Sequence, residues 1–412
     1  MSATFYDRFL AARLGSDVGC TVGDSQTKVQ LLFGARQTGK STLLKHVVGS
    51  SARTFVLNLQ DPRLRRRYEA DDALLVRELE SVADGSINVV IDEIQKVPAL
   101  LDGVQYLYDR DPKRFRFLLT GSSARRLKGR SANLLPGRVH TRLLSPVLQA
   151  EQRECAILPL KMGTGPKFPE RPLEDCLLHG SLPGLWHEER SSWVETLAAY
   201  AEFYVENEIR QDNVVRDMGS FLRFLRLAAL ESGQCVNYAK LAGVVGVAVN
   251  TLRTFYQVLE DTYVGFRMQP FARSRKRVLQ APRFLVFDLG VRHVLAELPV
   301  NATLLKLDAG HMFEQWVLAE LYYRCRYAGQ GHQLSTWTTA TGAEVDAVVE
   351  TPENVIPVEI KWTDSPTPRD AQHVETFLDL HGGLAKTGYV VCRCSRKQAL
   401  TRRVTALPWN EF

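Results

Sequence analysis

The chain has 412 residues, more than one compact domain usually holds, so we expect two to four domains. Its 45% hydrophobic, 9% aromatic and 24% charged residues exclude a disordered or collagen-like chain, and its seven cysteines, without a C-x-x-C pair, exclude a disulfide framework or zinc ribbon. No apolar run is long enough to span a bilayer, so we expect a cytoplasmic protein without a membrane partner, while the formal charge of +6 permits an acidic partner such as DNA.

The first predicted elements form a phosphate-binding loop. The apolar run Val29–Phe33 predicts a strand, and the periodicity that begins at Ser41 predicts a helix. Between them, residues 34–41 match G-x-x-x-x-G-K-[ST] at every fixed position. In such a loop the backbone N–H groups surround phosphates, Lys40 neutralises the β- and γ-phosphate charge, and Ser41 ligates Mg²⁺. The residues expected to bind ATP are Gly34, Ala35, Arg36, Gln37, Thr38, Gly39, Lys40, Ser41 and Thr42.

A second apolar strand, predicted at residues 87–91, ends in two acids, Asp92 and Glu93. Acids at the carboxyl end of a central parallel strand lie beside the crevice where ligands bind. Asp92 would therefore hold Mg²⁺ through its water shell, and Glu93 would orient or activate an attacking water. The second acid favours hydrolysis over phosphoryl transfer to a small molecule.

A third apolar strand, at residues 115–119, places the hydroxyls of Thr120 and Ser122 at the same end of the sheet. Their position resembles the sensor of AAA-type ATPases, in which a polar side chain reads the γ-phosphate. The alternative is that these hydroxyls cap the next helix.

An arginine, Arg138, precedes the expected fifth strand at residues 139–144. AAA+ proteins place an arginine finger there, which completes a neighbouring subunit's site, so the resemblance implies a homo-oligomer. Arg125 and Arg126 are rival candidates, and a solvated or structural role for Arg138 is the alternative.

These motifs together resemble a widespread family of prokaryotic AAA-type ATPases whose carboxyl-terminal half is a domain of unknown function. The resemblance covers nearly the whole chain and implies ATP hydrolysis, with Pro136 standing where members typically have Ala. The motifs that carry it are Tyr6-Asp7-Arg8, the phosphate loop, Asp92-Glu93-Ile94-Gln95-Lys96-Val97-Pro98, Leu119-Thr120-Gly121-Ser122-Ser123 and Leu135-Pro136-Gly137-Arg138.

The middle of the chain predicts a linker with a small lid, followed by a winged helix. Residues 151–190 are rich in Pro and Gly, and a helical pattern at residues 192–211 is typical of packing. Further on, a glycine-turned bend separates two helical patterns, as in a helix-turn-helix. The second pattern puts Leu252, Phe255, Tyr256 and Leu259 on an apolar face and leaves Asn250, Arg253 and Thr254 outward. The basic run at residues 273–277 resembles a wing that contacts phosphates, or else is a solvated loop of a protein-docking module.

Two alternating strands follow, at residues 344–350 and 355–361. If their turn is centred between Pro352 and Glu353, Asp346 lies opposite Glu359, and Glu344 lies opposite Lys361. The period of two places all four on one face. Facing carboxylates can share a hard cation, and a neighbouring lysine can polarise a hydrolytic water.

The order of these residues resembles the PD-(D/E)XK nuclease superfamily. Glu314 on a helix, then Asp346, then Glu359 and Lys361 match its four positions, which implies a second metal site at Asp346 and Glu359. Such sites also persist as ion-pair scaffolds without cleavage, so both readings stay open. A further basic cluster at residues 393–403 either extends a backbone-binding surface or is a solvated tail.

The sequence thus predicts an α/β protein with four parts. These are an AAA-type ATPase domain at 1–150, a linker and helical lid at 151–215, a winged helix at 216–280, and a restriction-endonuclease-like domain at 281–412. Our leading hypothesis is an Mg²⁺-dependent ATPase that couples nucleotide state to DNA engagement. The alternatives are a nucleotide switch that binds a protein partner and an active metal-dependent DNA endonuclease.

Overall fold

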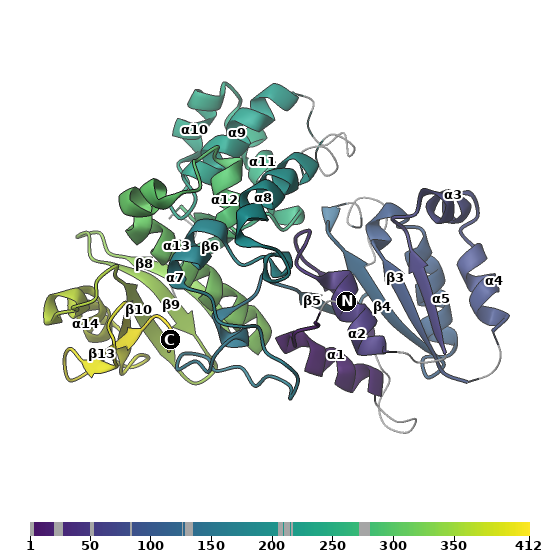
Figure 1. The fold of residues 1–412 in the computed structure, drawn as a ribbon, viewed down its shortest axis with the longest axis horizontal. Coiled ribbons are helices and arrows are strands. Elements are labelled where there is room, and N and C mark those ends of the chain that lie inside the picture. The colour runs from purple at the N-terminus through teal and green to yellow at the C-terminus, as the bar shows by residue number, and fades with distance from the viewer. Residues whose placement is uncertain are drawn as a thin grey trace. The chain divides into compact units, whose positions relative to one another are not determined.

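Figure 1 shows the fold as a computed structural model, which describes residues 4–19, 28–49, 53–82, 85–125, 127, 135–204, 209, 215, 217–271 and 281–412. The rival finger Arg126 and the basic run at 273–277 lie outside these residues. The chain folds into two compact units. Unit 1 comprises Met1–Ser145, Met162–Lys167 and Asp261–Tyr263, and unit 2 comprises Pro146–Lys161, Phe168–Glu260 and Val264–Phe412.

Unit 1 is built on a five-stranded parallel sheet with the order β2-β3-β4-β1-β5. Strands β1 and β3 are buried along their whole length, as expected for the centre of a parallel sheet covered by helices. Its elements are α1 (Phe9–Gly19), β1 (Val29–Phe33), α2 (Lys40–Val48), β2 (Thr54–Asn58), α3 (Pro62–Ala70), α4 (Leu74–Glu80), β3 (Ile87–Asp92), η1 (Ile94–Lys96), α5 (Leu100–Arg110), β4 (Phe115–Gly121) and β5 (Val139–Leu143).

The order of these strands determines where the candidate catalytic residues lie. Strand β4 lies between β1 and β3, in a register that sets Leu32 beside Thr120 and Ile91 beside Leu119. The carboxyl ends of these three strands therefore lie at the same edge of the sheet. That edge carries the phosphate loop after β1, the two acids after β3 and, between them, the hydroxyls of Thr120 and Ser122 at the end of β4. The apolar faces of β1, β3 and β4 share one core with α5, which fixes the strands to one another.

Unit 2 contains an eight-stranded mixed sheet with the order β12-β13-β11-β10-β9-β8-β6-β7. Its sequence includes the 27-residue helix α13, which carries a kink at Asp308. The main elements are α7 (Leu173–His179), α8 (Trp193–Tyr204), α9 (Met218–Leu230), α10 (Tyr238–Val245), α11 (Val249–Asp261), β6 (Gly265–Pro270), β7 (Arg283–Val286), α12 (Leu289–Leu295), α13 (Ala302–Ala328), β8 (Gln333–Thr338), β9 (Glu344–Glu350), β10 (Val355–Ile360), α14 (Gln372–Leu380), β11 (Gly388–Cys392), β12 (Gln398–Ala399) and β13 (Val404–Pro408).

Strand pairing in unit 2 runs across the domain boundary expected between residues 280 and 281. Strands β6 and β7 lie on its two sides and pair with each other, and β6 also pairs with β8. The helix-turn-helix of α10 and α11 is therefore followed by a hairpin that belongs to the sheet of the carboxyl-terminal part. The structure contains the mixed sheet, whereas the likeness of this sheet to a restriction endonuclease fold stays a prediction.

The predicted helix faces of the helix-turn-helix are confirmed. Leu252, Phe255, Tyr256 and Leu259 are buried, and Gly246 ends α10 in the left-handed conformation that the turn requires. Across the described part of the chain, no helix combines the length and apolar character of a membrane span.

Candidate active site

The phosphate loop joins β1 to α2. Gly39 has a φ of 89°, in the left-handed region that favours glycine, at the position before the first residue of α2. A Cβ at Gly34 would lie 2.6 Å from the carbonyl oxygen of Leu144, so the loop start also requires a glycine. The Lys40 ammonium donates to the carbonyl oxygens of Gly34 at 2.9 Å and Ala35 at 2.8 Å. These contacts hold a buried cation inside the loop, where phosphate charge is expected.

The two predicted magnesium ligands lie in contact. Ser41 donates its hydroxyl to the Asp92 carboxylate, at 2.9 Å from Oδ1 and 2.8 Å from Oδ2. Thr120 donates to the same Oδ1 at 2.5 Å. A hydroxyl and a carboxylate of this kind are the hard oxygen donors that Mg²⁺ prefers, so the residues present fit that cation.

Glu93 lies beside this pair in an unusual backbone conformation. Its φ of 60° is left-handed, and its N–H donates to the Thr120 hydroxyl at 3.0 Å. The side chain is only 4% exposed, and Oε2 accepts a hydrogen bond from Ser122 at 2.8 Å. Burial acts to raise the pKa of Glu93, but the charges of Lys40 and Arg36 outweigh it and hold that pKa below its usual value. The carboxylate is therefore ionised and able to accept a proton.

Both candidate sensor hydroxyls belong to this acidic network. Thr120 bridges Asp92 and the backbone of Glu93, whereas Ser122 contacts the Glu93 carboxylate. The neighbouring Ser123 hydroxyl accepts from the N–H of Arg125 at 3.3 Å. That Thr120 or Ser122 reads the γ-phosphate stays a prediction.

Sequence reasoning missed Arg8, which supports the phosphate loop from outside. Its guanidinium is 4% exposed and donates to the carbonyl oxygens of Thr38 at 3.0 Å and Ser145 at 2.7 Å. The preceding Asp7 accepts from the N–H of Gly165 at 2.8 Å. The motif Tyr6-Asp7-Arg8 was visible in the sequence, but partners up to 158 residues away gave it no role there.

Arg138 lies at the opposite edge of the sheet. Its carbonyl oxygen accepts from Val29, the first residue of β1, so the length of a five-residue strand, about 16 Å, separates it from the phosphate loop. The guanidinium is exposed and pairs with Asp109 at 2.5 Å. Arg138 therefore does not reach the phosphate loop of its own subunit. If it acts as an arginine finger, it must do so at the site of a neighbouring subunit.

In unit 2 the four predicted nuclease-like residues come together. The register of β9 and β10 pairs Val355 with Glu350 and Val358 with Ala347, as the predicted turn requires, and its continuation sets Asp346 opposite Glu359. Lys361 pairs with Glu359 at 2.7 Å. The predicted hairpin is thus confirmed.

An arginine that the sequence did not point to occupies this cluster. Arg283 at the start of β7 has a buried side chain that pairs with Glu314 and, at 2.5 Å, with Glu344. Burial, then the charges of Glu359 and Glu314, raise the pKa of Asp346 well above its usual value. Burial also raises the pKa of Glu359, against the effect of Lys361. The two facing carboxyls therefore resist ionising together.

Within the described ranges, no group of three or more His, Cys, Asp or Glu side chains is arranged to hold a metal ion. The metal-ligand role of Asp346 and Glu359 stays a prediction. On α11, Asn250, Arg253 and Thr254 are exposed as expected, with the Arg253 guanidinium 5.0 Å from the ring centre of Tyr238.

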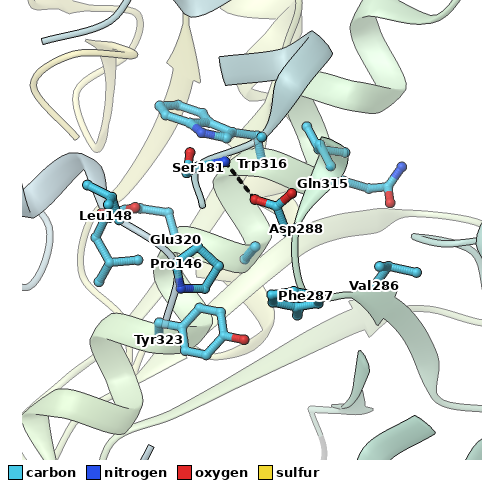
Figure 2. A pocket seen from close by; sticks show the side chains of 14 residues that line it. Pro146, Leu148, Ser181, Val286, Phe287, Asp288, Gln315, Trp316, Glu320 and Tyr323 are labelled. Atoms are coloured by element: carbon cyan, nitrogen blue, oxygen red, sulfur yellow. Dashed lines mark hydrogen bonds between the residues drawn. The ribbon is translucent and has the colours of Figure 1, made fainter. Parts of the chain in front are cut away.

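A cavity in unit 2 shares no lining residue with either candidate site (Figure 2). It measures about 30 Å³, enough for roughly two waters and too small for a nucleotide. Asp288 in its wall accepts from the N–H of Ser181 at 2.6 Å, and burial raises its pKa to about 6. Asp288 also accepts from the N–H of Val291 at the start of α12, which indicates a structural role.

Comparisons with family models divide the chain into three parts. Residues 26–152 match the model of an AAA domain, and residues 170–302 and 309–412 match two domains of unknown function, DUF8612 and DUF4143. An AAA domain is thus followed by two domains of unknown function. The AAA domain implies a P-loop ATPase that uses ATP.

Among curated proteins, the chain is 29% identical over 343 residues to the uncharacterized proteins Rv2008c of Mycobacterium tuberculosis and Mb2031c of Mycobacterium bovis, covering 82% of this chain and 71% of each relative. Among solved structures, C. elegans PCH-2 matches with 15% identity and a TM-score of 0.25, over 61% of this chain and 65% of that one. A DNA polymerase III gamma subunit-related protein from Thermotoga maritima matches with 12% identity and a TM-score of 0.26, over 61% of this chain and 98% of that one. The chain spans just under two thirds of the PCH-2 chain.

Proposed function

We propose that this protein is a magnesium-dependent ATPase that acts as a homo-oligomer and couples nucleotide state to engagement of DNA. One observation carries the ATPase assignment. Ser41, Asp92 and the ionised Glu93 meet at one edge of a parallel sheet, joined by hydrogen bonds through Thr120 and Ser122. The charge of Lys40 acts on the same Glu93 carboxylate.

The proposed reaction is attack of water on the γ-phosphorus of ATP. Glu93 takes a proton from the water as the new P–O bond forms, and the bond between the γ-phosphorus and the β–γ bridging oxygen breaks, with its electron pair leaving on ADP. Lys40 neutralises charge on the phosphates. Mg²⁺, held by Ser41 and Asp92, would supply further neutralisation of phosphate charge.

The DNA part of the proposal depends on the helix-turn-helix of unit 2. Asn250, Arg253 and Thr254 are exposed on one side of α11, near its amino-terminal end, where a recognition helix contacts bases. The alternative is a nucleotide switch that docks on a protein. The exposed apolar residues Val244 and Val249, beside the turn, favour that alternative, because apolar side chains gain more from burial against a protein than from lying beside charged phosphates.

A DNA-stimulated ATPase assay tests the proposal. We expect Mg²⁺-dependent turnover that a single-stranded, duplex or junction DNA increases, with stimulation that falls as salt rises because phosphate contacts release counterions. Lys40→Ala should lose turnover, while Lys45→Ala, an exposed lysine on the same helix α2, should retain it. DNA binding that is absent at low salt, or independent of salt, would favour the protein switch.

Cleavage of DNA by unit 2 is a second candidate function, favoured by the convergence of Glu314, Asp346, Glu359 and Lys361 in the predicted register. Nicking that disappears in both Asp346→Ala and Glu359→Ala would support it. Activity that survives both substitutions would come from a contaminant or another site.

Action across subunits has its own test at Arg138. Arg138→Ala and Glu93→Gln should each lose turnover alone, and a mixture should regain part of it. At mixed interfaces one subunit supplies an intact Glu93 and its neighbour supplies Arg138. Arg110→Ala, an exposed arginine on α5, is the matched control that should retain activity without mixing. A mixture as inactive as its components would assign Arg138 to its ion pair with Asp109.

A further inference from the structure

Gln95 contacts the Glu93 carboxylate from the turn η1, which directly follows Glu93. The side chain is 3% exposed, and its Nε2 donates both to Oε2 of Glu93 and to the Ser122 hydroxyl, 2.9 Å away. Ser122 in turn donates to the same Oε2. Two donors, themselves hydrogen-bonded to each other, therefore hold one oxygen of the carboxylate.

This placement is costly for Gln95. Its Oε1 is buried and has no hydrogen-bond partner among the described residues. An unsatisfied buried acceptor lowers the stability of the fold. The amide does not gain by turning over, because its oxygen would then face the Glu93 carboxylate. An apolar side chain of similar length would avoid this cost, so stability alone does not account for a glutamine here.

The end of β4 also leaves room for this amide. A Cβ at Gly121 would lie 3.1 Å from Oε1 of Gln95 and 2.9 Å from Cε1 of Phe33. A larger residue at position 121 would therefore press on the side chain that holds Glu93. Gly121 and Gln95 belong to different sequence motifs. The absence of a side chain at Gly121 leaves space for the Gln95 amide, which contacts the Glu93 carboxylate.

We infer that Gln95 is a positioning residue for ATP hydrolysis, which fixes Oε2 of Glu93 and leaves Oε1 to take the proton of the attacking water. The inference rests on the proposed ATPase function. Gln95 does not touch the reacting atoms in this role. It acts by restricting the rotation of a carboxylate that must be aligned with the water when the reaction occurs.

Gln95→Met tests the inference, because methionine keeps the length and apolar packing but cannot donate. We expect kcat to fall on the order of ten- to a hundredfold, less than the loss of the general base itself, with ATP affinity unchanged. The thermal midpoint should stay the same or rise, since the unsatisfied oxygen is gone. A purely structural role would lower the midpoint and leave the kcat of the folded protein at its wild-type value.

Gln105→Met on α5 is the matched control, with wild-type values expected throughout, and Gln95→Ala is a second variant that cannot overfill the site. Wild-type kcat in either folded variant of Gln95, or failure of both to fold, would overturn the inference. If the wild-type protein does not hydrolyse ATP, both the proposed ATPase function and the inference about Gln95 are wrong.

Discussion

Glu93→Gln should bind ATP with wild-type affinity and hydrolyse it at a rate lower by a factor of about 10²–10⁴, the usual contribution of a general base. The amide matches the carboxylate in size, so the packing of this buried side chain is kept. It cannot accept the proton of the attacking water at neutral pH. The measurement is a steady-state phosphate-release assay, paired with equilibrium binding of a fluorescent ATP analogue.

The control for this variant is Glu69→Gln, an exposed glutamate of α3, which should behave as wild type. The left-handed backbone at Glu93 is the same in both proteins, because glutamine has the same backbone preferences as glutamate. A Glu93→Gln protein that turns over ATP at the wild-type rate would show that another group takes the proton. Loss of ATP binding would instead point to a collapsed loop.

The candidate active site was largely predictable because its signals are local in sequence. The phosphate loop needs glycines at two positions of one turn, and the acids Asp92 and Glu93 directly follow one apolar run. Parallel strand order then brings these separate segments to one edge. Ser41 and Asp92 are 51 residues apart, yet each was identified from its own local motif and the contact between them followed.

Arg8 and Gln95 were not predictable in the same way. A buried arginine whose partners are backbone carbonyl oxygens leaves no side-chain pattern in the sequence, since every residue carries a carbonyl. Gln95 was visible in its motif, but its role depends on Ser122 at the end of another strand. Such roles need the three-dimensional register of β3 and β4.

The carboxyl-terminal hairpin combines a feature that the sequence predicted, its strand register, with one that it did not, the contact with Arg283. Its register followed once the turn was centred between Pro352 and Glu353, because residues paired across a hairpin keep a constant sum of their numbers. Arg283 escaped notice because it precedes an ordinary apolar strand, 31 residues before Glu314 and 61 before Glu344. The position of β7 in the sheet, which the sequence did not reveal, places the Arg283 guanidinium beside those carboxylates.

The cation at the centre of that cluster makes the second large prediction. Arg283→Met should destabilise unit 2 by about 3 kcal/mol, the lower end of the usual cost of breaking a buried ion pair, because Glu314 and Glu344 are 25% and 43% exposed. The Arg283 side chain is 7% exposed and holds Glu314 and Glu344, and the charge of Asp346 also acts on it. Chemical denaturation monitored by tryptophan fluorescence measures the loss, and Arg326→Met, exposed on α13, is the matched control.

The pH dependence of this loss separates charge from packing. Without Arg283 the Asp346 carboxyl loses a nearby positive charge, so its folded-state pKa, already raised, rises further above the unfolded value. An acid with a raised pKa destabilises the fold above its unfolded pKa, and that cost disappears as pH falls below it. The defect of Arg283→Met should therefore shrink between pH 7 and pH ~4.5. Added Mg²⁺ or Mn²⁺ should also reduce it if the freed carboxylates bind a cation. A defect equal at both pH values would mean that Arg283 acts through packing alone.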